Sequence, residues 1–513
     1  MQRVPLLVGT RVWLVPVPER GVVLQPPPPA AAVADVGAAI RDALRFPLSG
    51  EPLEALVRRD GRVTIVVEPP SLPIPGSHQD PREAAIDASV GELERIGVSL
   101  ERQTLLVACG LARRPTRRQV EELVPPELAR RFRGTVAVHD AEDEALVEVA
   151  RADGAPLRVN RAVVDTDAVV TVTAAETVLH GGAGTLLAAS DAATIRRACA
   201  VSLLEPATAP GWELAAALER ALSRRAAVVG ASLVLNHPRM TGALRGFPYE
   251  EEAVERVARS PLRRLYSLLP RPARERVLHA LPLELSAAAA FAGPPSVAHA
   301  EALLRGIELR SAELDRPLDA LVVPIPRTTP YLPRERPNPL LAATLGLGLA
   351  LRLWRDAFPL ADGGTAILLD PFHRHFRHPT QQPYRAFFQA SRAGRDPGAL
   401  VAAERTAVHE RAVAEYRAGR ACHPLLPFVD WAACAPALDR LGAVLVAGCR
   451  DAVAARQLGF IPTHGLGAAL EMVRGRSGAD ARIGFLLAPP YFPLRVKSGA
   501  FGAPTFPRLR LTD

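Results

Sequence analysis

Short apolar runs alternate with longer amphipathic stretches along most of the 513-residue chain. The apolar runs are rich in Val, Ile and Leu, as is typical of strands buried on both faces of a parallel sheet. The amphipathic stretches between them, such as residues 87–96 and 403–417, predict crossover helices. This alternation indicates an α/β protein. The predicted strands are residues 63–67, 104–108, 168–173, 320–324, 365–369 and 443–447.

The middle of the chain has a different pattern. It is rich in Arg, Ala, Leu and Glu and is interrupted by prolines, which predicts helices and connections. A chain of this length is too long for one ordinary core, because a domain usually has about 100 to 200 residues. We therefore predict an N-terminal α/β domain over residues 1–211, a mainly helical connecting region over 212–314 and a C-terminal α/β domain over 315–513. A cleft is expected between the two α/β domains.

Composition limits the classes of partner. With 48% hydrophobic and 23% charged residues, the chain is typical of a soluble globular protein. The net charge is +8, but the arginines are dispersed and no basic stripe alternates with aromatic residues, so we expect no nucleic-acid partner. The run 340–351 is too short to span a bilayer and is followed by Arg352, so we expect no membrane partner. The oligomeric state is left open.

The expected location is the cytoplasm. Five cysteines form no CxxC pair, which favours a reducing compartment, and the first residues lack the apolar core of a signal peptide. The chain contains a single lysine, Lys497, among 62 basic residues. Because arginine stays protonated and forms no Schiff base, chemistry that needs a lysine is excluded everywhere except at Lys497.

Several local phrases occur in a fixed order. They lie at residues 43–48, 62–68, 106–110, 154–161, 167–182, 291–299, 362–365 and 458–462. This order resembles the lactate racemase (LarA-like) family and extends over nearly the whole chain. The resemblance implies two α/β domains with a cleft between them. It also implies an enzyme in which a nickel-pincer nucleotide, tethered to a lysine, exchanges a hydride with the substrate's α-carbon while histidines move a proton.

The functional positions depart from the pattern of that family. Leu72 stands where the resemblance places a substrate-binding arginine, and Ala112 stands where it places a catalytic histidine. Gly184 occupies the position of the cofactor lysine, and Cys199 that of a metal-binding histidine. The segment before Gly184 is short and offers no clear equivalent of the family's preceding histidine. We therefore expect neither a covalent nickel-pincer nucleotide nor ordinary nickel-dependent lactate racemisation.

Candidate residues remain around residue 180. Gly181 and Gly182 follow an apolar strand and could present backbone N–H groups to a phosphate or carboxylate. The alternative is a tight strand-to-helix turn that requires glycine for its conformation. His180 and Cys199 could share a divalent metal, since imidazole and thiolate both suit such ions. The alternative is a capping histidine and an ordinary buried cysteine.

Two further candidates lie near the predicted strand 104–108 and after it. Arg113 could bind an anionic ligand in bidentate fashion, or it could make an ordinary solvated contact. His139 precedes Asp140 and could be a general base oriented by a carboxylate. However, adjacent residues of a strand point to opposite faces, which weakens this interpretation.

A histidine-rich segment directly follows the predicted strand 365–369. If it is extended, His373 and His375 face the same side and could chelate one ion. Arg374, Arg377 and the histidines favour anion binding equally well, because ligands collect at the carboxyl ends of the strands in open α/β sheets. A surface loop without function is the third possibility. We expect the loop to face the cleft and to bind an anion.

The sequence therefore predicts a divergent, isomerase-like enzyme acting on a small hydroxy acid or another anionic metabolite. The alternative is a ligand-binding or scaffold protein that kept the cleft and lost the chemistry. The candidate catalytic residues are His139 and His180, and the candidate ligand-binding residues are Arg113, Gly181, Gly182, Arg374 and Arg377. A divalent metal at Cys199, His373 or His375 is possible.

Overall fold

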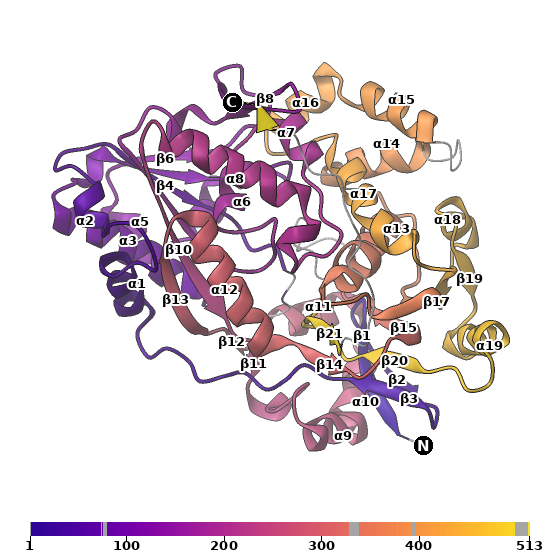
Figure 1. Ribbon diagram of the computed structural model, residues 1–513. Helices are drawn as coiled ribbons and strands as arrows, with labels where there is room; N and C mark the ends of the chain where they lie inside the picture. Colours follow the sequence, from indigo (N-terminus) through magenta and orange to yellow (C-terminus); the bar gives the residue numbers. More distant parts are fainter. Residues whose placement is uncertain are drawn as a thin grey trace.

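The computed structural model describes residues 2–72, 74, 79–327, 338–376, 378–390, 397–497 and 511–512. Among them, two six-stranded sheets dominate (Figure 1). The first has the strand order β13-β10-β9-β4-β5-β6, and all neighbours are parallel except β13, which is antiparallel to β10. Its strands are β4 (Val63–Val67), β5 (Gln103–Val107), β6 (Thr135–Val138), β9 (Ala168–Ala174), β10 (Ala227–Leu235) and β13 (Ala287–Gly293).

Helices cover both faces of the first sheet. Successive residues of a strand point to opposite faces, so Ile65 packs with α1 (Val36–Arg45) and α3 (Pro81–Ile96), whereas Val66 packs with the helices on the other side. Those helices are α6 (Ala183–Ala188) and α8 (Pro210–Ser223), and α12 (Pro295–Arg310) packs along β10. Coverage on both faces explains why these strands are apolar at nearly every position.

The second sheet is entirely parallel, in the order β19-β18-β17-β15-β20-β3. One face packs against the hairpin of β1 (Arg3–Val8) and β2 (Arg11–Pro16) and against α19 (Leu466–Ser477). The other face packs against α17 (Leu426–Leu438) and the helical run after residue 338. The strands are β3 (Gly21–Leu24), β15 (Leu318–Pro324), β17 (Leu360–Leu369), β18 (Ala443–Ala447), β19 (Ile461–Thr463) and β20 (Ile483–Leu486).

These sheets confirm the predicted α/β fold class. All six predicted strands are present, and β4 and β18 have the predicted bounds. The expected helix over residues 403–417 is instead two helices, α15 (Pro397–Ala407) and α16 (Glu410–Arg417). The break occurs where the His409 side chain accepts a hydrogen bond from the Ala412 amide and so caps α16.

Sheet membership does not follow the predicted domain boundaries, which stay a prediction. The region 212–314 does contain helices, including α9 (Glu251–Arg259), α10 (Pro261–Leu268) and α11 (Arg271–His279). It also contributes β10 and β13 to the first sheet. The strand β13 lacks the usual sequence signal because four of its residues are consecutive alanines, which have low strand propensity. At the other end of the chain, β3 belongs to the second sheet, beside β20 (Figure 1).

The strand order of the first sheet reverses between β4 and β9. From β4 the chain adds β5 and β6 on one side and then returns to add β9 and β10 on the other. Loops that leave the carboxyl ends of β4 and β9 therefore diverge, and such a point is where open α/β sheets bind ligands.

Shorter elements complete the described part of the chain, and no helix there has the length and apolar character needed to cross a bilayer. The remaining helices are α2 (Leu53–Leu56), α4 (Arg117–Glu121), α5 (Pro126–Arg131), α7 (Ala192–Arg197), α13 (Pro339–Ala343), α14 (Gln382–Ala390) and α18 (Ala452–Gln457). The remaining strands are β7 (Val147–Ala152), β8 (Ala155–Val159), β11 (Arg239–Met240), β12 (Leu283–Glu284), β14 (Ala312–Leu314), β16 (Trp354–Arg355), β21 (Leu494–Val496) and β22 (Leu511–Thr512).

Candidate functional site

A cavity of about 250 Å³ lies where the carboxyl ends of β4, β5 and β9 meet helices that pack on the second sheet. Segments within 68–71, 108–112 and 177–203 line it from one side, and segments within 341–352 and 426–436 from the other. Most of the lining side chains are apolar, and a few are polar or charged. This composition is typical of sites for small molecules.

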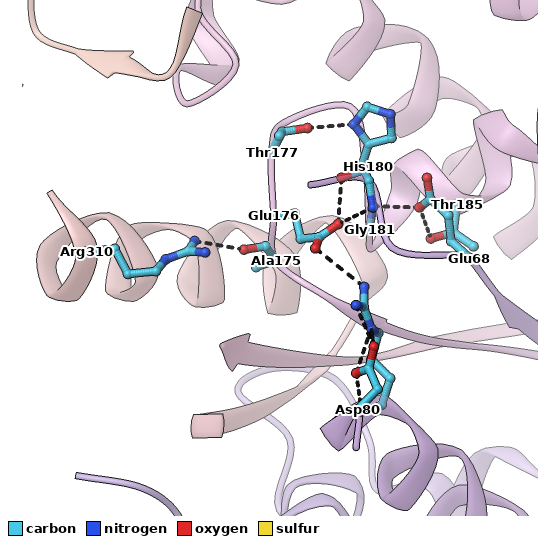
Figure 2. A network of polar contacts seen from close by, with 11 residues as sticks. Glu68, Asp80, Ala175, Glu176, Thr177, His180, Gly181, Thr185 and Arg310 are labelled. Atoms are coloured by element: carbon cyan, nitrogen blue, oxygen red, sulfur yellow. Dashed lines mark hydrogen bonds and ion pairs between the residues drawn. The ribbon is translucent and has the colours of Figure 1, made fainter. Parts of the chain in front are cut away.

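Glu68 follows β4 and reaches the cavity. Its Oε2 atom accepts hydrogen bonds from the Gly181 amide at 2.9 Å and from the Thr185 hydroxyl at 3.4 Å (Figure 2). Burial raises the pKa of the Glu68 carboxyl to about 8, although the hydrogen bond from Gly181 opposes the shift. At neutral pH this carboxyl is therefore mainly protonated and can donate a proton.

Gly181 is conformationally required at this turn. Its φ is +100°, and a Cβ atom there would lie 2.5 Å from the Ala174 carbonyl oxygen. The structure thus has the tight strand-to-helix turn that was one of the two predicted alternatives. The Gly181 amide, considered above as a donor to a bound anion, instead donates to the protein's own Glu68.

A buried polar cluster holds the loops after β4 and β9 together. Glu176 accepts hydrogen bonds from the Ser71 amide at 2.7 Å and from the Ser71 hydroxyl at 2.5 Å. Arg82 lies 3.5 Å from Glu176 and forms an ion pair with Asp80 at 2.7 Å. Because these charges are buried, they are stable only as a paired set, and the set fixes the position of Ser71 on the cavity wall.

His180 lines the same cavity as Glu68. Its Nδ1 atom lies 2.8 Å from the Thr177 hydroxyl oxygen, which orients the ring (Figure 2). Burial lowers the pKa of His180; Glu176 opposes this shift and Arg352 adds to it. The imidazole is therefore neutral at neutral pH and can accept a proton.

Arg352 brings a positive charge to the cavity from the second half of the chain. It is the last residue of the helical turn η6 (Ala350–Arg352), which directly follows η5 (Thr344–Leu349). Its guanidinium donates to the carbonyl oxygens of Ala200, of Val201 at 3.3 Å and of Gly348 at 3.1 Å. In the sequence, Arg352 is recognisable only as an arginine directly after the apolar run 340–351. That pattern argues against a membrane span and does not by itself indicate a binding site.

Asp430 is a second residue that sequence reasoning missed. It lies in α17, is 2% exposed and lines the cavity. Its Oδ2 atom accepts a hydrogen bond from the Tyr384 hydroxyl at 2.6 Å, and burial raises the pKa of the Asp430 carboxyl to about 7. A single acid inside an otherwise apolar helix was the signal that could have identified it.

The residues of the cavity do not fit a lysine-tethered cofactor. Gly184 lies in the first turn of α6, against the backbone of the preceding turn, and a Cβ atom there would lie 2.5 Å from the Leu179 carbonyl oxygen. A side chain of any kind therefore clashes, lysine included. Cys199 lines the cavity but is exposed and follows α7, so the predicted alternative of an ordinary buried cysteine is wrong. Partial desolvation raises the pKa of its thiol, which disfavours the thiolate that binds metals. Within the described residues, no group of three or more His, Cys, Asp or Glu side chains is placed to hold an ion.

Apart from the histidine-rich loop, four of the predicted site residues lie outside the cavity lining, namely Gly181, Gly182, Arg113 and His139. The Gly182 amide donates to the Thr173 hydroxyl at 2.9 Å, within the protein. Arg113 is half-buried just beyond the lining residue Ala112. His139 is fully buried, with Nε2 at 2.8 Å from the Ser190 carbonyl oxygen and Nδ1 at 3.2 Å from an Asn160 nitrogen. Burial lowers the pKa of His139 to about 4, so it is a neutral core residue at neutral pH.

The described residues of the histidine-rich loop do not line this cavity either. The rings of His373 and His375 stack with centroids 5.1 Å apart. Arg374 forms an ion pair with Asp451, which caps α18. Arg377 lies outside the described residues. The structure thus places His180 and Cys199 on the cavity wall and leaves His373, Arg374 and His375 elsewhere, where anion or metal binding by the loop stays a prediction.

Comparisons with known proteins agree with this architecture. A model of the lactate racemase N-terminal domain matches residues 9–185. The structure of the lactate racemase apoprotein from Thermoanaerobacterium thermosaccharolyticum is similar, with a TM-score of 0.62 and 13% identity, over 96% of this chain and 100% of that chain. A crystal structure of a protein from Thermotoga maritima has a TM-score of 0.48 and 13% identity, over 91% and 100%. No protein with a curated description matches the sequence.

Proposed function

We propose that this chain is a lactate racemase-like protein and a divergent, isomerase-like enzyme that transfers a proton on a small anionic metabolite; the match of residues 9–185 to the lactate racemase N-terminal domain and the similar fold support the first part. One observation carries the proposal. A mainly protonated Glu68 and a neutral His180 line the same cavity, into which Arg352 brings a positive charge. Acid and base groups with opposite protonation states at one pH are what general acid–base catalysis requires.

Each residue then has a distinct role. Arg352 attracts the carboxylate of the metabolite, and the low dielectric of the cavity strengthens that attraction. His180 accepts a proton from the metabolite through the nitrogen that faces away from Thr177. Glu68 donates a proton to the opposite group or stabilises developing negative charge there by a hydrogen bond.

The proposal involves no nickel-pincer nucleotide. Gly184 stands at the position that the family resemblance assigns to the cofactor lysine, and the Leu179 backbone leaves no room there for a side chain. In this proposal, carbon-bound hydrogen is moved as a proton by residues of this chain.

A second candidate function is ligand binding without chemistry. It is favoured by Ala112, which stands where the resemblance places a catalytic histidine and which lines the cavity without any titratable group. A protein of this kind would bind the same anion and release it unchanged.

Exchange of carbon-bound hydrogen tests the two candidates. The protein is incubated in D₂O with a panel of 2-hydroxy and 2-keto carboxylates, and exchange is followed by proton NMR while binding is measured by calorimetry. The enzyme predicts exchange that falls about 10²- to 10⁴-fold in His180→Gln with little change in affinity. Binding without exchange in the unmodified protein would favour the ligand-binding protein.

A further inference from the structure

We infer that the ligand of the cavity is an amphipathic carboxylate, in which the anionic group is joined to an apolar tail of several carbons. The inference rests on the proposed function for the location of the anionic group. It concerns binding alone, so it can be tested whether or not the protein performs chemistry.

One wall of the cavity is apolar. It is formed by α13, η5 and α17, which pack against one another beneath the second sheet. The side chains that these elements place on the cavity are mainly aliphatic. The exceptions are Thr344, whose hydroxyl donates to the Leu340 carbonyl oxygen at 2.9 Å, and Asp430, whose carboxylate accepts from the Tyr384 hydroxyl at 2.6 Å, so both have partners within the protein. The aliphatic side chains include Leu341, Leu345, Leu349, Leu426, Val429 and Ala433.

The other polar groups gather on the opposite wall. Glu68, Ser71 and His180 all follow strands of the first sheet. Arg352 comes from the second half, but its guanidinium is bonded to the carbonyl oxygens of Ala200 and Val201, which belong to the first half. The positive charge is therefore held beside the polar wall, and a ligand has its anionic end there.

The size of the cavity requires more than a short acid. A volume of about 250 Å³ is just below the range found for drug-sized ligands. A three-carbon hydroxy acid bound at the polar wall would leave the aliphatic wall without contacts. An apolar tail gains free energy by covering that wall, whereas sugar or nucleotide hydroxyls there would lose their hydrogen bonds to water without replacement.

Calorimetric titration with a homologous series tests the inference. The probes are lactate, 2-hydroxybutanoate, 2-hydroxyhexanoate and 2-hydroxyoctanoate, added to the full-length protein. We expect Kd to fall by about fourfold for each added methylene until the cavity is filled, because each buried methylene contributes a similar increment. Equal affinities along the series, or affinity that falls with tail length, would overturn the inference.

A variant that fills the cavity tests whether the apolar tail of the ligand lies against the aliphatic wall. Ala433→Phe should weaken binding of 2-hydroxyoctanoate by at least about tenfold and change that of lactate by less than about threefold. The matched control is Ala435→Phe, because Ala435 is exposed on the same helix and is outside the cavity lining. If Ala433→Phe does not fold by circular dichroism, Leu349→Asn makes the same wall polar and should likewise weaken the long-chain ligand. Equal loss for lactate and 2-hydroxyoctanoate in the folded variant would contradict this placement of the tail.

The experiments distinguish failure of this inference from failure of the proposed function. A chain-length preference without hydrogen exchange supports the amphipathic ligand and overturns the enzymatic proposal. Exchange on lactate with a flat chain-length series supports the enzyme and overturns the amphipathic ligand.

Discussion

The hydroxyl oxygen of Thr177 lies 2.8 Å from Nδ1 of His180, and its carbonyl oxygen lies 2.9 Å from Nε2 of His299. One threonine therefore contacts two imidazoles, one on the cavity wall and one fully buried. Burial lowers the pKa of His299 to about 4, so this inner imidazole stays neutral at neutral pH and donates to the Thr177 carbonyl. The turn that holds His180 is thus supported from within the core.

Removing the Thr177 hydroxyl should impair proton transfer more than binding. Thr177→Val keeps the shape of the side chain but releases Nδ1 of His180, and we expect the exchange rate to fall by about tenfold. Thr177→Ser should restore most of the rate, because it returns the hydroxyl. The measurement is hydrogen exchange by NMR alongside Kd by calorimetry. Equal rates in Thr177→Val and Thr177→Ser would show that the hydrogen bond does not orient the base.

Glu68 should make stability depend on pH in a defined direction. Its folded-state pKa of about 8 lies above the ordinary value of 4.5, so the folded protein keeps a proton that the unfolded chain releases. The contribution of Glu68 is fully present below pH 4.5 and is lost as pH rises through 8. Relative to Glu68→Gln, we expect the free energy of unfolding of the unmodified protein to fall by about 2 kcal/mol between these two pH values. This is less than the whole pKa shift would give, because solvent in the cavity screens the charge.

Urea unfolding at a series of pH values checks this expectation. Buried histidines and Asp430 also make the free energy of unfolding depend on pH, the histidines in the opposite direction to Glu68 and Asp430 in the same direction. Both effects are common to the unmodified protein and Glu68→Gln, so they cancel when the two proteins are compared at each pH. Stability curves of the unmodified protein and Glu68→Gln that run parallel from pH 4.5 to 8 would contradict the raised pKa.

Gly184 should not tolerate even a methyl group. Gly184→Ala places a Cβ atom 2.5 Å from the Leu179 carbonyl oxygen, and we expect a loss of about 1 to 3 kcal/mol in the free energy of unfolding. The matched control is Gly91→Ala in α3, where a Cβ atom meets nothing within 4 Å. That change should stabilise the protein by about 0.5 to 1 kcal/mol through helix propensity. Similar effects of the two substitutions on unfolding would remove the steric argument against a tethered lysine.

Tyr416 should link the two halves of the chain. Its hydroxyl donates to the Gly110 carbonyl oxygen at 3.0 Å and accepts from the Ala141 amide at 3.1 Å, so α16 is bonded to loops after β5 and β6. Tyr416→Phe leaves both backbone groups buried without this partner and should cost about 2 to 4 kcal/mol. Tyr266→Phe is the control, because its hydroxyl makes one partly buried bond to Thr10, and it should cost about 1 kcal/mol. Equal unfolding free energies for the two variants would argue against a linking role for Tyr416.

Sequence reasoning was most accurate where the signal is local. The strands β4 and β18 were predicted with correct bounds because β4 is a run of β-branched Val, Thr and Ile, and β18 a run of Ala, Val and Leu, each buried on both faces. The turn at Gly181 was also foreseen as one of two alternatives. The other alternative was that its amide binds an external anion. Nothing in the local sequence reveals that Glu68, more than a hundred residues earlier, accepts the hydrogen bond from this amide.

The site was predicted only in part for the same reason. His180 was named because it adjoins a glycine pair, whereas Arg352 and Asp430 come from the second half of the chain. Their roles depend on how the helices of one half meet the strand ends of the other, and hydrophobic periodicity carries no information on that docking. His139 was named as a candidate base from its neighbour Asp140, and the structure buries it outside the cavity lining; a histidine beside an aspartate looks alike in the sequence whether it is buried or open to a cavity.

The pairing of β3 with β20 has a consequence for protein synthesis. These strands are separated by about 460 residues, from Leu24 to Ile483. At about 5 to 20 residues per second, β3 leaves the ribosome roughly 20 to 90 seconds before its partner exists. The strands of the first sheet all lie between Val63 and Gly293 and can assemble during that interval. The second sheet can acquire β3 only after β20 has been made, so β3 stays without its sheet partner while the whole of the chain between them is synthesised.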